Sequence, residues 1–269
     1  MRLGTVRLRH TPGVDRAWLR PLTGADEQLV EEASTVTALA LLDRLLVPAP
    51  GGEPAPAAAR LATADRDRVL AWLHGRMYGS RVASTDTCDA CGEPFDLDFD
   101  LEALVRHSEQ GDAAGEGDAA KEGDAAGEGD TVPEGLPRVR PPTGEDELAV
   151  AAMDPAEAVR TLLARCVEEG GPEDLDTDAV EAALALRAPL LAQDLELACP
   201  ECRAVQRIHF DVQDFFLATL AGERERLLRE VHALAAGYGW SLGEILSLGR
   251  SERRRLAELV LGTDTPGWT

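Results

Sequence analysis

Two C-x-x-C pairs are the residues of this chain whose type and spacing point most directly to a chemistry. The first lies in CDACG at Cys88–Gly92 and the second in CPEC at Cys199–Cys202. Each pair stands just before a run in which apolar and polar residues alternate. Zinc prefers four thiolate or imidazole ligands in a tetrahedron, and a C-x-x-C turn presents two sulfurs on one side of a tight loop. The sequence therefore predicts one zinc ion held by Cys88, Cys91, Cys199 and Cys202.

The predicted site is structural, because four cysteines leave no ligand position open for a substrate. Reduced, metal-free cysteines and redox chemistry stay as alternatives, although a thioredoxin-like motif wants a single C-x-x-C in a βαβ context. Cys166 is predicted to be a small core residue and His209 to face solvent. No Ser-His-Asp, Cys-His or paired-carboxylate set emerges, so we expect no enzyme.

Composition limits the classes of partner. The chain has 269 residues and a formal net charge of −22, which repels phosphate backbones unless its positive charges cluster. No apolar run is long enough to cross a membrane, and the N-terminus lacks the apolar core of a signal peptide. We therefore expect a cytoplasmic protein that binds neither nucleic acid nor membrane.

The elements that would position the cysteines occur twice along the chain. The pattern Arg-Pro-x-Thr-Gly-x-Asp-Glu appears within Leu19–Ala33 and again within Val139–Met153. In each, the threonine is expected to cap a helix, and the aspartate three residues later answers it as in a capping box. The capping pairs are Thr23 with Asp26 and Thr143 with Asp146.

The order of the following elements also matches. Each capped helix is followed by two further predicted helices, then by one of the C-x-x-C turns, which we call knuckles, and then by a strand. The helices are expected over Thr35–Val47 and near Thr63–Tyr78 in the first half, and over Asp154–Val167 and near Thr177–Arg187 in the second. The strands are expected at Phe95–Leu101 and Arg207–Val212, and an N-terminal hairpin at Thr5–Arg9 and Ala17–Leu19.

This order predicts an α+β, mainly helical fold with two duplicated halves that share a four-cysteine zinc ribbon, plus an all-helical C-terminal tail. The halves are 1–108 and 137–212, and the tail is 213–269. Between the halves, 109–136 contains a six-residue repeat of Gly, Ala and acid with no aliphatic bulk, which predicts a disordered linker. A calcium-binding turn repeat and an acidic docking tail are the alternatives for this segment.

The tail is expected to carry the partner-binding residues. A Gly-Tyr-Gly-Trp turn interrupts its helices, and arginines crowd the first turns of the last helix, where they oppose the helix dipole. That placement suggests an acidic partner, although pairing with this chain's own carboxylates explains it equally well. The predicted contact residues are Tyr238, Trp240, Arg250, Arg253, Arg254 and Arg255.

The run EVHALAAGYGWSLGEILSLGRSERRRLAELV, at Glu230–Val260, resembles a C-terminal signature of the T-even-type baseplate hub assembly chaperone family. The Leu22–Glu27 segment, Tyr78-Gly79 ahead of the first knuckle, and Phe210–Asp211 after the second are also similar to that family. Together these matches touch most of the chain outside 48–58 and the acidic linker. The sequence departs from the pattern in that linker and in Arg203, which stands in place of a glycine.

The resemblance implies a non-enzymatic assembly chaperone for the baseplate hub of a contractile phage tail or injection system. Its partner would be a hub or spike protein, held until a permanent partner displaces the chaperone. A stoichiometric structural component of the baseplate is the first alternative. A zinc-ribbon regulator acting on the transcription machinery or nucleic acid is the second.

Overall fold

Two helices of the computed structural model, α1 (Gly24–Leu29) and α5 (Gly144–Val150), begin at the threonine caps that the sequence predicts. The structure describes residues 4–114, 136–169 and 176–262. Thr23, Thr143 and Ser241 each form a capping box with the acidic residue three positions later. Residues 115–135 of the predicted disordered linker lie outside the described residues. Its first residues, 109–114, belong to a helix that runs on to Ala114, so the linker begins later than predicted.

The chain divides into two compact units. Unit 1 contains Met1–Arg7, Arg16–Ala58 and Gln213–Thr269, and unit 2 contains Leu8–Asp15 and Ala59–Val212. The predicted tail is therefore not a separate domain, because it forms one unit with the first helices of the chain. This division follows neither of the predicted halves.

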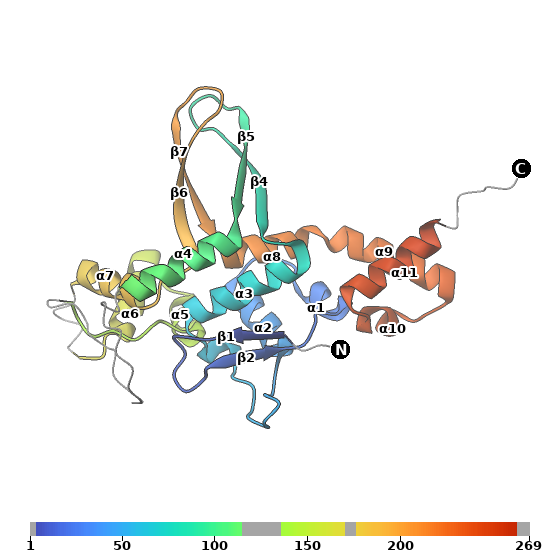
Figure 1. The fold of residues 1–269 in the computed structure, drawn as a ribbon, viewed down its shortest axis with the longest axis horizontal. Helices are drawn as coiled ribbons and strands as arrows, with labels where there is room; N and C mark the ends of the chain where they lie inside the picture. The colour runs from blue at the N-terminus through green and yellow to red at the C-terminus, as the bar shows by residue number, and fades with distance from the viewer. Residues whose placement is uncertain (1–3, 115–135, 170–175, 263–269) are drawn as a thin grey trace, which may run out of the picture. The chain divides into compact units, whose positions relative to one another are not determined.

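Unit 1 combines a small sheet with two groups of helices (Figure 1). Its antiparallel sheet has the order β1-β2-β3, with Gly4 opposite Leu19 and Leu19 opposite Leu46. Leu234, Ile245 and Ala257 form the core beneath the last three helices. The elements are β1 (Gly4–Arg7), β2 (Arg16–Leu19), α1 (Gly24–Leu29), α2 (Thr35–Leu45), β3 (Leu46–Val47), α8 (Val212–Gly222), α9 (Arg224–Tyr238), α10 (Leu242–Ser247) and α11 (Arg250–Gly262).

Unit 2 places two β-hairpins beside a set of helices (Figure 1). Each hairpin has seven residue pairs, from Arg81↔Asp100 to Thr87↔Pro94 in one and from Ala192↔Asp211 to Ala198↔Val205 in the other. The elements are η1 (Ala58–Arg60), α3 (Thr63–Tyr78), β4 (Arg81–Thr87), β5 (Pro94–Asp100), α4 (Leu101–Ala114), α5 (Gly144–Val150), α6 (Pro155–Cys166), α7 (Thr177–Arg187), β6 (Ala192–Ala198) and β7 (Val205–Asp211). Among the described residues, no helix has both the length and the apolar character needed to cross a membrane.

A buried carboxylate organises the start of α1. Asp26 accepts the backbone N–H and the hydroxyl of Thr23, both at 2.9 Å. Arg20 donates to both of its oxygens at 2.6 and 2.8 Å, and Arg44 of α2 donates through Nε at 2.8 Å. Burial raises the pKa of Asp26, but hydrogen bonds from Arg20 and Thr23 outweigh it and lower the pKa to about 2. One carboxylate thus fixes α1, α2 and the segment before them.

Asp26 with its threonine and two arginines forms an arrangement that we call a cage, and a second cage occurs in unit 2 at the start of α5. Asp146 accepts the N–H and hydroxyl of Thr143 at 3.0 and 2.9 Å, and both oxygens receive Arg140 at 2.6 and 2.9 Å. Arg165 of α6 donates through Nε at 2.8 Å. The pKa of Asp146 is also lowered, because these hydrogen bonds outweigh its burial. Corresponding distances in the two cages agree within 0.1 Å.

Each cage is covered by a helix from elsewhere in its unit. In unit 1, Thr23 forms a β-bridge with Gly249, and Arg253 of α11, four residues on, donates to both oxygens of Glu27 at 2.9 Å. In unit 2 the corresponding bridge joins Thr143 to Ala62, and a helix of the first half covers the cage. Four residues beyond this bridge, Arg66 of α3 pairs with both oxygens of Glu147. Helix α11 therefore stands to α1 as α3 stands to α5.

Candidate metal centre and helical tail

Both C-x-x-C knuckles adopt the same backbone turn. Gly92 N–H donates to the carbonyl of Cys88 at 2.8 Å, and Arg203 N–H donates to the carbonyl of Cys199 at 3.0 Å. The residue after each second cysteine is left-handed, with φ of 75° at Gly92 and 65° at Arg203. Glycine adopts this conformation without strain, whereas a residue with a Cβ does so at a cost of about 1 kcal/mol. The second knuckle therefore keeps the turn despite its less suitable residue.

The four sulfurs meet at the ends of the two hairpins. Their Sγ atoms all lie within 4.8 Å of one another. The Cys88–Cys202 distance is 3.6 Å and the Cys91–Cys199 distance is 3.8 Å, and both of these contacts join one knuckle to the other. A tetrahedron with metal–sulfur bonds of ~2.3 Å has sulfur–sulfur edges of about 3.8 Å, whereas a disulfide needs ~2.05 Å. The four cysteines thus lie at the spacing of a metal site.

The pKa values of the two thiols in the first knuckle are shifted in opposite directions. Burial raises the pKa of Cys88, but backbone N–H groups of Cys91 and Ala90 outweigh it and lower the pKa to about 7. A backbone hydrogen bond at Glu93 favours the Cys91 thiolate, yet burial and neighbouring thiols together raise its pKa to about 12. One thiolate is readily accommodated, and a cation is the group that neutralises several at once.

An apolar core beneath the sulfurs holds the hairpins together. Cys88, Phe95 and Cys199 are buried in one cluster, against which Leu197 and Ile208 pack. Lower down, Phe99 of β5 and Phe210 of β7 meet edge to face with ring centroids 4.8 Å apart. These side chains come from the alternating runs of the sequence, whose acidic partners on β5 are exposed. The inward faces of the two hairpins therefore bring both knuckles to one point.

The base of the β6–β7 hairpin is tied to α3. Asp67, which is buried, accepts the backbone N–H of Leu191 at 3.2 Å, and Leu191 in turn accepts the N–H of Val212. Burial raises the pKa of Asp67 to about 7, in spite of nearby Arg66. Asp67 looks like an ordinary helix residue in the sequence, and only its position against the hairpin shows what it does.

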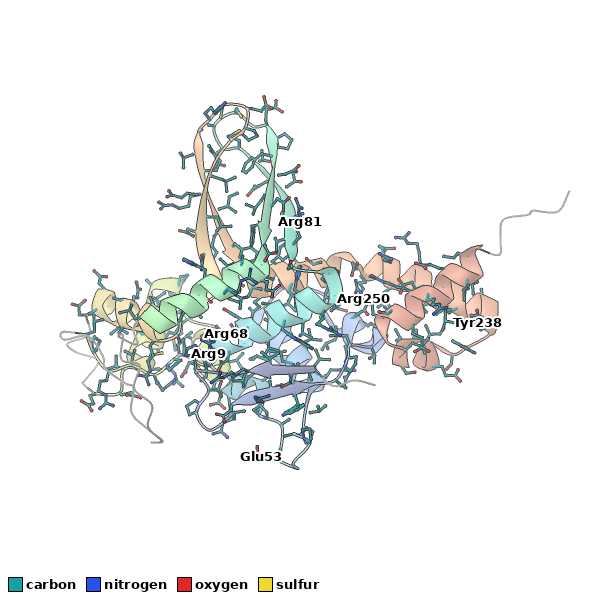
Figure 2. All side chains as sticks on the ribbon, viewed as in Figure 1. Arg9, Glu53, Arg68, Arg81, Tyr238 and Arg250 are labelled. Carbon is teal, nitrogen blue, oxygen red and sulfur yellow. The ribbon has the colours of Figure 1, made fainter. Side chains whose placement is uncertain are left out.

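The predicted contact residues of the tail fall into two groups. Tyr238 and Trp240 are 43% and 36% exposed and stack on each other with ring centroids 4.9 Å apart. Figure 2 shows Tyr238 at the C-terminal end of α9. Arg255 is also exposed. These three side chains are accessible to a partner, and their role as contact residues stays a prediction.

The other predicted arginines pair with carboxylates of unit 1. Arg253 has no exposed side-chain surface and donates to Glu27 and, at 2.8 Å, to Glu230. Arg250, labelled in Figure 2, is buried and pairs with Glu27 and Glu223. Arg254, partly buried, also reaches Glu223 at 2.9 Å and Glu230 at 3.5 Å. Pairing within the chain, the alternative that the sequence left open, is therefore present for these three residues.

Two further sequence predictions concern residues away from the site. Cys166 is fully buried, and burial raises the pKa of its thiol to about 11, as suits a core residue. The side chain of His209 is 66% exposed and contacts Asp194 on the neighbouring strand. Both predictions are confirmed. Sequence reasoning missed Arg226 and Arg229 on α9, whose one-turn spacing is the only local sign that they share a face.

Comparison of this chain with family models, with curated proteins and with solved structures found no match.

Proposed function

We propose that the four-cysteine cluster holds one structural zinc ion that joins the two hairpins. The sulfur spacing supports this proposal, as does a ligand set made entirely of cysteine, which zinc favours in closed sites. Bound zinc would replace the protons of the thiols and cross-link knuckles more than a hundred residues apart in sequence. Cys88, Cys91, Cys199 and Cys202 would all be ligands, so the metal would have no position for a substrate.

We also propose that the two halves arose by duplication. The support is the pair of matching cages, in which Arg20, Thr23, Asp26 and Arg44 correspond to Arg140, Thr143, Asp146 and Arg165. A shared metal site would then join equivalent hairpins of two related halves. Helix α11 of the tail would then cover the cage of the first half, in the position that α3 occupies over the cage of the second half.

The function that we propose is that of a non-enzymatic assembly chaperone for the baseplate hub of a contractile tail or injection system. The observation that carries it is the resemblance of Glu230–Val260 to the family signature. The structure forms that run into α9, the Tyr238–Trp240 turn, α10 and α11. The chaperone would hold a hub or spike subunit through the exposed aromatic turn until assembly displaces it.

A stoichiometric structural component of the baseplate is the second candidate. The buried ion pairs that attach α11 to α1 and α9 favour it, because they make the tail a firmly built part of unit 1. A nucleic-acid regulator has less support, since three of the tail arginines are already paired with carboxylates and the net charge is −22.

Affinity capture from the native host distinguishes these functions. The tagged protein would be recovered separately from free complexes and from sheathed particles, and its partners identified by mass spectrometry. The chaperone proposal expects hub or spike proteins in the free fraction and none of this chain in finished particles. Recovery in particles at a fixed ratio would make it a structural component, and capture of polymerase or nucleic acid alone would reject both.

The aromatic turn provides a variant for the same experiment. Trp240→Ala is expected to weaken capture of the hub or spike protein about tenfold, because aromatic anchors dominate protein interfaces. Leu186→Ala removes an exposed apolar side chain from α7 of unit 2 and serves as the control. Circular dichroism and zinc content should stay unchanged in both variants. Loss of fold or metal in Trp240→Ala would show that Trp240 is a packing residue.

A further inference from the structure

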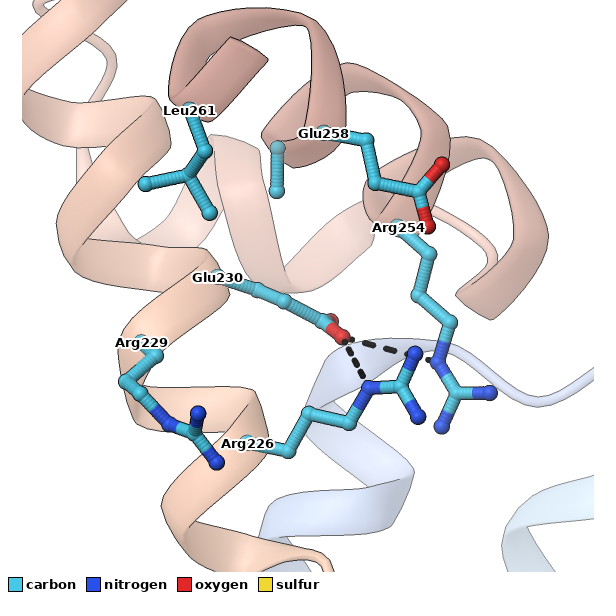
Figure 3. Close-up of a pocket in the computed structure, with 7 residues that line it drawn as sticks. Arg226, Arg229, Glu230, Arg254, Glu258 and Leu261 are labelled. Atoms are coloured by element: carbon cyan, nitrogen blue, oxygen red, sulfur yellow. Dashed lines mark ion pairs between the residues drawn. The ribbon is translucent and has the colours of Figure 1, made fainter. Parts of the chain in front are cut away.

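A small hollow lies between α9 and α11 in unit 1 (Figure 3). Arg226 and Arg229 of α9 border one side, and Arg254 and Glu258 of α11 border the other. Its apolar part is formed by Ala257 and by Leu261, whose side chain is 58% exposed. The hollow measures about 160 Å³, whereas pockets for drug-sized ligands measure roughly 300–1,000 Å³. It therefore has the size for one or two side chains of a protein partner.

The acid inside the hollow is already occupied by arginines. Glu230 receives Arg253 at 2.8 Å, Arg226 at 3.3 Å and Arg254 at 3.5 Å, in each case through Nε. Figure 3 shows the pairs with Arg226 and Arg254 as dashed lines. The contact of Arg226 with Glu230 is made through Nε at 3.3 Å, and Arg229 donates its Nε–H to the Glu225 carbonyl at 3.3 Å. Within the described part of the chain, Arg226 pairs with the carboxylate of Glu230, and Arg229 forms no ion pair with a carboxylate.

The charge around the hollow differs from the charge of the molecule. Residues 213–269 contain seven arginines and eight carboxylates, whereas the chain as a whole has 27 basic and 49 acidic residues. Arg226 and Arg229 are both exposed and lie one helical turn apart on α9, so this side of the hollow offers two guanidinium groups to a carboxylate of a ligand. Glu258 on the opposite side disfavours a purely acidic ligand, and exposed Leu261 favours an apolar group beside the acid.

We propose that this hollow docks a short acidic and apolar segment of a protein partner. One carboxylate of the segment binds between Arg226 and Arg229, and an adjacent apolar side chain packs on Leu261 and Ala257. The inference rests on the proposed function, in which the helical tail binds the hub or spike protein, and it names the chemistry of the segment that is recognised. It also moves the arginine contact from the start of α11, where Arg250 and Arg253 are buried, to α9.

Fluorescence anisotropy with the full-length protein and labelled synthetic peptides tests the docking. The probe is a short peptide in which Glu and Leu alternate, and the comparison peptides replace Glu by Gln or Lys, or Leu by Ser. The Glu–Leu peptide should bind, whereas each comparison peptide should bind about tenfold more weakly or not at all. Tighter binding at lower salt is expected, because the contact includes a charge pair.

A matched pair of double variants locates the binding site. Arg226→Gln with Arg229→Gln should weaken the Glu–Leu peptide about tenfold or more. Arg7→Gln with Arg16→Gln removes the same charge from exposed positions of β1 and β2 in unit 1, and should change affinity less than about twofold. Equal weakening in both double variants, equal binding of the Lys peptide, or no binding of the Glu–Leu peptide would overturn the proposal.

The same variants separate this proposal from the assembly function. If the Arg226→Gln, Arg229→Gln double variant still captures the hub protein from the host as the unmodified protein does, the docking site is rejected. The chaperone function would then still stand. Site-dependent peptide binding with no baseplate protein captured would support the docking site and reject the chaperone function.

Discussion

At the scale of the residue, buried aspartates determine how the two short helices α1 and α5 begin. Asp26 and Asp146 each combine the capping contact with two arginines, so each ties three segments together through one carboxylate. Neither aspartate side chain exceeds 2% exposure. Because their arginines are partly exposed, the pairs avoid the full cost of burying both charges. The caps were predictable from the local sequence, but the second arginine of each cage, Arg44 or Arg165, comes from the next helix.

The pH dependence of stability should reveal this cage. The folded-state pKa of Asp26 is about 2, below its ordinary value of 3.8, so the stabilisation is present at neutral pH. It is lost as the pH falls from about 4 towards 2. Urea unfolding should therefore find Asp26→Asn about 2 kcal/mol less stable at pH 7, with the difference shrinking below pH 4. The exposed Asp15→Asn variant is the control. A difference that persists unchanged through acid would show that the amide disturbs packing rather than the ion pairs.

At the scale of the element, the pairing of helices depends on contacts that local sequence does not encode. The starts of α1, α5, α6 and α10 were predictable from their capping residues. By contrast, Glu27 and Arg253 are 226 residues apart, and the local sequence around either residue does not predict that they pair. The sequence matched α3 with α7 as third helices of two halves. The contacts instead make α3 and α11 equivalent, because each covers a cage.

Close approach of α9 and α11 makes a glycine necessary at position 237. A Cβ there would lie 2.8 Å from both Cγ atoms of Val260, whereas a Cβ at Gly243 of α10 would have no neighbour within 4 Å. Thermal unfolding should show Gly237→Ala destabilised by about 1–2 kcal/mol through overpacking. Gly243→Ala should be neutral or up to about 1 kcal/mol more stable, because alanine favours the helix. Adding Val260→Ala should restore much of the loss in Gly237→Ala, and failure to do so would place the strain elsewhere.

At the scale of the whole molecule, the cysteines were the feature that the sequence predicted best. A C-x-x-C pair indicates metal binding through residue type and spacing alone, and four cysteine sulfurs that lie close together are typical of a zinc site. The division into units could not be predicted in the same way. Unit 1 is assembled from both ends of the chain through buried side-chain contacts such as those of Arg250, whose partners are distant in sequence.

Metal removal should therefore affect the two units unequally. A metal that joins Cys91 to Cys199 closes a loop of more than a hundred residues within unit 2, and a cross-link over such a loop is worth on the order of 4 kcal/mol. We expect about one zinc ion per chain, lost equally in Cys88→Ser and Cys199→Ser and retained in the control Cys166→Ala.

In the metal-free protein, hydrogen exchange should accelerate in β4–β7 and stay unchanged in α9–α11, whose core does not include the cluster. Two zinc ions per chain, or loss from only one of the serine variants, would show that the knuckles bind separately. Equal loss of protection in both units would show that the metal supports the fold of the whole chain rather than the hairpins alone.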